Sequence, residues 1–120
     1  MDSNQLVLRT KQFALNIIRL FQNLPKTDEA RILGKQLLRS GSSVAANYRA
    51  ACRSRSKQEF YSKLCIVVEE SDETLFWLEL LLDSGILKNE LISPLIKESQ
   101  ELLLIFSASR KTFKNNLRST

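Results

Sequence analysis

Residues 56–85, SKQEFYSKLCIVVEESDETLFWLELLLDSG, decide the fold, because they form one long amphipathic pattern with a clear start and a clear end. Ser56 and Glu59 have the spacing of a capping box, which begins a helix. Gly85 fits the position just past a helix, where the backbone is left-handed. We therefore expect a helix over residues 56–84 whose apolar stripe contains Phe60, Leu64, Val67, Ser71, Leu75, Leu78 and Leu82.

The same apolar period continues on both sides and predicts helices over residues 4–23, 28–53 and 89–117. Pro25 separates the first two helices, and Thr27 supplies an N-cap for the second. We expect the first helix to bury Leu6, Phe13, Ile17, Leu20 and Leu24, the second Leu33, Leu37, Gly41, Val44, Tyr48 and Ala51, and the last Leu91, Leu95, Leu102, Ile105, Phe106, Phe113 and Leu117.

Prolines and glycines disturb this pattern at three places inside the expected helices. Pro94 lies within the last helix, which begins either near residue 89 or with Ser93 as its cap. Gly34 and Gly41 lie within the second helix, and each costs about 1 kcal/mol of helix propensity relative to alanine. An uninterrupted helix there needs tertiary contacts, which the close approach of another helix would supply.

Four amphipathic helices joined by loops of a few residues pack as antiparallel neighbours. The sequence has no Asn-Gly or Asp-Gly pair of the kind that favours a β-hairpin. We therefore predict an all-α fold, an antiparallel up-down-up-down four-helix bundle that forms a single domain over residues 1–120.

The composition excludes much catalytic and metal chemistry. No histidine is present, so the chain has no His-based general base and no His metal ligand. Cys52 and Cys65 lack the spacing of redox or metal motifs, and we expect them to be buried, reduced thiols. Glu70 and Glu73 are the enzymatic alternative, as an acid/base pair or metal ligands, but metal-binding bundles use Glu-x-x-His. We predict no enzyme, no catalytic residue, no metal and no cofactor.

The N-terminal segment MDSNQLVLRT has no basic stretch followed by an apolar one, as a signal peptide would have. No apolar run reaches the roughly 18 residues that a membrane-spanning helix needs. We expect a soluble, cytoplasmic protein with no membrane partner.

Charge is unevenly distributed along the chain. Residues 64–87 carry six acidic side chains and no lysine or arginine, a charge of −6, so the rest of the chain must carry +11 to give the net charge of +5. Two basic clusters follow, one at the turn between the second and third helices and one near the end of the last helix. Their distance is left open, and they bind either a phosphate backbone or the acidic stretch of another subunit. Their members are Arg49, Arg53, Arg55 and Lys57, and Arg110, Lys111, Lys114 and Arg118.

Polar residues interrupt the apolar stripes of the second and third helices. We expect them to form a structural polar network that sets helix register, with Arg39 paired to a carboxylate and Asn47 filling the remaining hydrogen bonds in a partly dry interior. The sequence shows no aromatic stacking platform, and Phe60 is assigned to the core. The network consists of Arg39, Ser40, Asn47, Glu70, Glu73 and Trp77.

The run QLLRSGSSVAANYR at residues 36–49, followed by Phe60, Glu70 and the segment ETLFWLE at residues 73–79, resembles the 23S ribosomal RNA intervening-sequence proteins. The resemblance spans about residues 8–112. It implies a bacterial four-helix bundle whose function is not established for most members. Related proteins accompany diversity-generating retroelements, where a barrel-shaped pentamer contacts a reverse transcriptase and is thought to bind nucleic acid.

The resemblance therefore implies a homopentamer with a basic surface. One position departs from it, because Ala50 stands after Tyr48 and Arg49 where the family pattern has an acid. That change removes one expected ion pair.

The leading hypothesis from the sequence is a non-enzymatic, oligomeric helical bundle that binds nucleic acid, RNA ahead of DNA, through phosphate contacts by the two basic clusters. The second hypothesis is a protein–protein scaffold, an accessory subunit that docks a nucleic-acid enzyme such as a reverse transcriptase.

Overall fold

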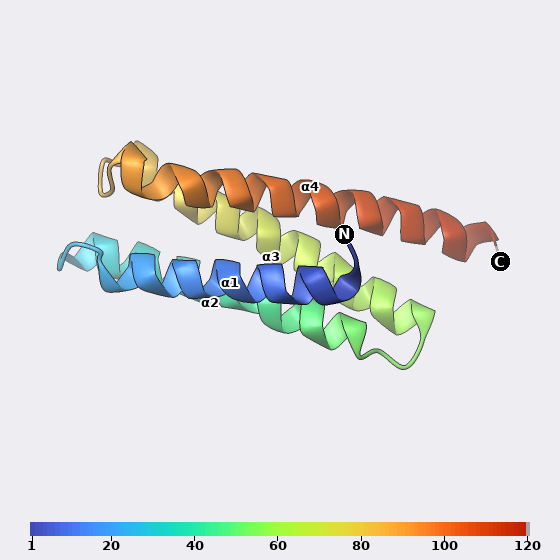
Figure 1. Cartoon of the computed structure of the whole chain (residues 1–120). Coiled ribbons are helices and arrows are strands. Elements are labelled where there is room, and N and C mark those ends of the chain that lie inside the picture. The colour runs from blue at the N-terminus through green and yellow to red at the C-terminus, as the bar shows by residue number, and fades with distance from the viewer. Residues whose placement is uncertain (120) are drawn as a thin grey trace.

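Four helices make up the protein, which a computed structural model describes over residues 1–119 (Figure 1). Each helix runs antiparallel to the one before it, and together they form the predicted up-down-up-down bundle, 52 Å long and 23 by 21 Å across. The helix bounds differ from the expected ones by at most two residues, and residue 120 lies outside the described part. The helices are α1 (Ser3–Gln22), α2 (Asp28–Cys52), α3 (Lys57–Asp83) and α4 (Asn89–Ser119).

Side-chain caps fix where the first three helices begin. The Thr27 hydroxyl accepts a hydrogen bond from the Ala30 amide at 3.2 Å, and the Ser56 hydroxyl accepts one from the Glu59 amide at 3.1 Å. Asp2 and Gln5 form a reciprocal capping box that the sequence analysis did not identify. Gly85 has a φ of 78°, so the left-handed residue expected after α3 is confirmed.

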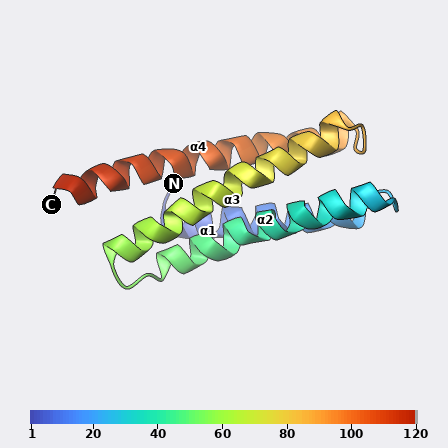
Figure 2. The same ribbon diagram turned by 180° about the vertical axis from the view of Figure 1, so that it is seen from behind.

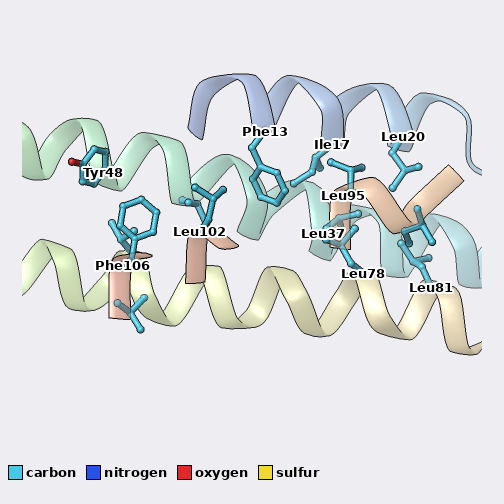
Figure 3. Close-up of a cluster of buried hydrophobic side chains, with 14 of the residues drawn as sticks. Phe13, Ile17, Leu20, Leu37, Tyr48, Leu78, Leu81, Leu95, Leu102 and Phe106 are labelled. Carbon is cyan, nitrogen blue, oxygen red and sulfur yellow. The ribbon is translucent and has the colours of Figure 1, made fainter. Parts of the chain in front are cut away.

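The hydrophobic core is one continuous interior built by all four helices. Figure 3 shows Phe13 and Ile17 of α1 pointing into the same interior as Leu37 of α2, Leu78 of α3 and Leu102 of α4. Burying a side chain of this size contributes about 1.5–3 kcal/mol. The interior therefore supplies the main force that holds the helices together.

A seam of buried positions separated alternately by three and four residues runs along every helix, and Ser40 and Val68 are buried beside it. The seam has a seven-residue repeat, which keeps it facing its neighbours when helices coil around one another with a left-handed sense. The seams are Leu6, Thr10, Phe13, Ile17, Leu20 and Leu24; Ala30, Gly34, Leu37, Gly41, Val44, Tyr48 and Ala51; Leu64, Val67, Ser71, Thr74, Leu78 and Leu81; and Ile92, Leu95, Ser99, Leu102 and Phe106.

Eight expected core positions are wrong or only partly right, because the seam has this shorter repeat. Leu75 and Leu82 of α3 are half-buried, because each comes one residue after a seam position, Thr74 or Leu81. Leu33 of α2 is half-buried because it comes one residue before the seam position Gly34. Leu91 is 61% exposed and Ile92 is buried in its place, because α4 begins at residue 89 and continues through Pro94. Phe60, Ile105, Phe113 and Leu117 are likewise half-buried rather than core.

Glycines let α1 approach α2 closely. A Cβ atom at Gly41 would overlap the Cδ1 methyl of Ile17, and one at Gly34 would overlap a methyl of Leu24. Ile17 is fully buried, so it has little room to move aside. The contact compensates for the poor helix propensity of these glycines, as the sequence analysis expected.

The contact between α1 and α4 is much the smallest of the four helix contacts, and an ionic cluster reinforces it. The Arg9 guanidinium donates to both carboxylate oxygens of Glu98, at 2.6 and 2.7 Å, and to Glu101 at 2.6 Å. Arginine binds a carboxylate with two parallel bonds in a fixed geometry, so this cluster also sets the register of α1 against α4.

None of the helices described over residues 1–119 is both long enough and apolar enough to span a bilayer.

Replacing Gly41 with alanine is expected to lower the free energy of unfolding by up to about 2 kcal/mol, because overpacking costs about 1–3 kcal/mol and the gain in helix propensity returns about 1 kcal/mol. Ser42→Ala, on the exposed side of the same helix, is the matched control and should leave stability within about 0.5 kcal/mol. Urea denaturation measures both. Ile17→Val removes the methyl that would overlap the new Cβ. It should therefore lower the free energy of unfolding by less in the Gly41→Ala protein than in the wild type. An equal loss in both backgrounds would show that the two positions do not touch.

Candidate nucleic-acid interface

The first basic cluster lies on the turn that joins α2 to α3. Arg53 caps the C-terminus of α2, its amide bonded to the carbonyls of Ala50 and Ala51, and Ser56 starts α3 three residues later. The side chains of Arg49, Arg53, Arg55 and Lys57 are all exposed. The tight reversal between two helices thus presents four cations at one end of the bundle.

The second basic cluster lies on the last turns of α4. Lys111, Lys114 and Arg118 are exposed and Arg110 is half-buried. In an up-down-up-down bundle α2 and α4 run in the same direction, so their C-termini lie at the same end, as Figures 1 and 2 show. The two clusters therefore share one end of the molecule, here called the basic end.

Aromatic contacts connect the two clusters. The rings of Phe60, at the start of α3, and Phe113, near the end of α4, lie with their centroids 5.0 Å apart. Desolvation and then a hydrogen bond with the Cys65 thiol raise the pKa of Tyr61, while the charges of Arg110 and Arg118 oppose the rise. The first turns of α3 and the last turns of α4 are thus packed side by side.

None of the eight cations of the basic end forms an ion pair with a carboxylate of residues 1–119. Within the described residues, the ion pairs are formed by Arg9, Arg39 and Lys63, and none involves a member of either cluster. Unpaired, exposed cations retain their field and their hydrogen-bond donors for an external anion. The basic end therefore has the electrostatics of an anion-binding surface.

An open surface cavity of about 460 Å³ lies at the basic end, and its lining includes Arg55, Lys57, Phe60 and Phe113. Cys52 also lines it and is exposed, so the expectation of a buried thiol is wrong for Cys52, while Cys65 is half-buried. The sequence analysis missed Cys52 and Phe113 as parts of this site. The predicted antiparallel topology could have identified both residues, because it places the C-terminal ends of α2, with Cys52, and α4, with Phe113, at the same end of the bundle.

Asp2 and Glu59 lie at the basic end, but the exposed acidic residues farther along α3 occupy a different surface. Glu69, Asp72, Glu79 and Asp83 are exposed along α3, and all lie beyond its N-terminal turns. The molecule is therefore electrically polarised, with a basic end and an acidic flank on α3. Across residues 1–119 no three acidic or cysteine side chains gather closely enough to hold a metal ion.

The polar network forms between α2 and α3, but at the surface rather than in a dry interior. The Arg39 guanidinium donates to Glu70 at 3.2 Å and also to Glu73. The Trp77 indole donates to the same Glu73 oxygen at 3.0 Å. Arg39 is 48% exposed, so solvent screens these interactions.

Asn47 and Ser40 are not part of this network. The Asn47 amide donates to the Ser43 carbonyl at 2.8 Å, and the buried Ser40 hydroxyl donates to the Leu37 carbonyl at 3.3 Å. Both bonds stay within α2, because a short polar side chain in a helix finds the carbonyl of the preceding turn closest. The expectation that Asn47 completes the Arg39 pair is therefore wrong.

Comparison with known proteins gives a family and a solved structure that resemble this chain. Residues 3–108 match the family model described as 23S rRNA-intervening sequence protein. A crystal structure of a protein of unknown function from the S23 ribosomal protein family of Bacteroides thetaiotaomicron superposes with a TM-score of 0.84 at 32% sequence identity, covering 92% of this chain and 99% of that one. No curated protein sequence matches.

Glu73→Ala is expected to lower the free energy of unfolding by on the order of 1 kcal/mol at neutral pH, because Glu73 joins Arg39 to Trp77. Glu69→Ala, an exposed carboxylate on the same helix, is the control and should stay within about 0.5 kcal/mol of the wild type. Chemical denaturation measures both. Equal stability of the two variants would contradict a structural role for the network.

The effect of Glu73→Ala should also depend on pH. The Trp77 hydrogen bond, and then the Arg39 guanidinium, hold the pKa of Glu73 below its ordinary value of 4.5 in the folded protein. A lowered folded pKa contributes stability above 4.5 and loses it as the pH falls through the lowered value. The stability difference between Glu73→Ala and the wild type should therefore shrink as denaturation is repeated below pH 4.5.

Proposed function

Because this chain belongs to the 23S rRNA-intervening sequence protein family, and its solved relative carries no assigned function, we propose a function from its own basic end. The protein is a non-enzymatic, oligomeric helical bundle that binds nucleic acid through contacts between the eight cations and phosphate groups. RNA ranks ahead of DNA because the family name associates these proteins with 23S rRNA.

One observation carries the proposal: the fold gathers both basic clusters at one end, and no member is paired to a carboxylate among residues 1–119. Phosphate contacts by lysine and arginine release counterions and supply most of the affinity of non-specific nucleic-acid binding. Such contacts position a protein without reading sequence. The net charge of +5 adds long-range attraction to the same ligand.

Large exposed apolar side chains support the oligomeric part of the proposal. Leu8 of α1 is 68% exposed, Leu104 of α4 is 71% exposed, and Ile32 of α2 is 62% exposed. Contact with other subunits would remove such surfaces from water. Five subunits is the number that the resemblance implies.

A second candidate function is a scaffold that docks a nucleic-acid enzyme such as a reverse transcriptase. The acidic flank favours it, because Ile66 and Phe76 are 42% and 53% exposed on the same face of α3 as Glu69 and Glu79. Apolar residues surrounded by charge are typical of protein interfaces. In this case the basic end would contact a protein and would show no steep salt dependence with RNA.

Binding to a labelled structured RNA is expected to weaken steeply as salt is raised, because each phosphate contact releases counterions. Arg53→Glu with Arg55→Glu should reduce the slope of log affinity against log salt by about 2. Arg31→Glu with Lys35→Glu makes the same charge change on exposed residues near the start of α2, at the opposite end, and serves as the control. Fluorescence anisotropy measures all three proteins. A flat slope, or equal losses in both double variants, would count against the basic end as the binding surface.

Light scattering coupled to size exclusion is expected to give a mass about five times the 13.8 kDa of one chain. Leu104→Glu, which places a charge on the most exposed leucine, tests whether α4 contributes to the assembly and should lower the mass. A wild-type mass of a single chain would refute the oligomer.

A further inference from the structure

Two kinds of residue line the cavity of the basic end. Arg55 and Lys57 are cationic. Phe60 and Phe113, here called the aromatic wall, are aromatic, with their ring centroids 5.0 Å apart. Its volume of about 460 Å³ lies in the range of small-molecule sites, about 300–1,000 Å³. The cavity is thus large enough for one compact ligand that carries both an anionic and a flat apolar part.

A buried hydroxyl of the same cavity is without a partner. The Oγ atom of Ser54 is shielded from solvent and has no hydrogen-bond partner within the described residues, whereas the neighbouring Ser56 hydroxyl is used as the cap of α3. A shielded hydroxyl without a partner is unfavourable, so the turn beside the cavity contains a polar group whose hydrogen bonding is not satisfied.

We propose that this cavity holds one unpaired nucleotide of a bound nucleic acid, its base against the rings of Phe60 and Phe113 and its phosphate against Arg55 and Lys57. The proposal rests on the function proposed above and makes its substrate class specific, namely single-stranded nucleic acid or unpaired nucleotides in a folded RNA. A free phosphate would leave the rings unused, and an uncharged apolar ligand would leave the cations unused.

Base pairing determines whether a base can stack on the rings of Phe60 and Phe113. In a duplex each base is stacked between its neighbours, so its faces cannot meet a protein ring, whereas an unpaired base can stack on an aromatic side chain. The cations act on either form, because both carry phosphates. The aromatic wall therefore adds affinity for the single strand only.

The main experiment compares two probes by fluorescence anisotropy at fixed salt: a short labelled oligouridylate and a blunt RNA duplex of the same length. The full-length protein should bind the single strand more tightly. Phe113→Leu keeps an apolar side chain but removes the ring, and should weaken single-strand binding on the order of tenfold while changing duplex binding less than about twofold. Phe76→Leu, an exposed aromatic residue of α3 outside the cavity, is the matched control and should change neither.

Two native cysteines give a second measurement that needs no variant. Cys52 is exposed and lines the cavity, and Cys65 is half-buried and is not part of its lining. The oligouridylate should slow alkylation of Cys52 by iodoacetamide and leave the rate at Cys65 unchanged. The duplex should protect Cys52 less.

The outcomes separate this inference from the proposed function. If Phe113→Leu binds the oligouridylate as well as the wild type does, or if Cys52 stays unprotected, the nucleotide site is wrong even when charge reversal at Arg53 and Arg55 still weakens binding. If neither probe binds, both the site and the nucleic-acid function are wrong. Thermal melting followed by circular dichroism checks that Phe113→Leu is folded.

Discussion

The seven-residue repeat of buried positions is the constraint on which the rest of the structure depends. All four helices follow it, from Leu6 in α1 to Phe106 in α4. Because 3.5 residues per turn is slightly less than the 3.6 of a straight helix, such a seam stays in contact with its neighbours only if the helices coil around one another. The repeat fixes the rotation of each helix about its own axis, and that rotation decides which side chains face solvent.

Small side chains on this seam set how closely the helices approach. Gly41 meets Ile17, and Thr10 and Thr74 are buried with their hydroxyls bonded to carbonyls one turn earlier in their own helices. Hydroxyls bonded within their own helix need no partner across the interface, so they can occupy a seam as small residues do. Ser71 and Ser99 are buried without a partner among the described residues, so the close packing comes with incompletely satisfied polar groups.

Electrostatics follows from the same arrangement. Arg9 and Arg39 are the arginines that lie across a helix seam from carboxylates, and they pair with them between α1 and α4 and between α2 and α3. The cations of the basic end lie at and beyond the last turns of the core, and none of them is paired with a carboxylate of residues 1–119. The core therefore determines which positive charges act within the protein and which are available to a ligand.

The sequence by itself determined the four helices, their bounds within two residues, the caps at Thr27 and Ser56, and the composition of both basic clusters. These features depend on neighbours only a few residues away in the chain. Other features became visible only in the tertiary structure. Phe60 packs against Phe113, and Arg39 lies at the surface. Cys52 is exposed, and Ile92 rather than Leu91 is buried in the core. The physical reason is that contacts between helices depend on axial register and rotation, and these are set jointly by all four seams when they pack, not by any one helix alone.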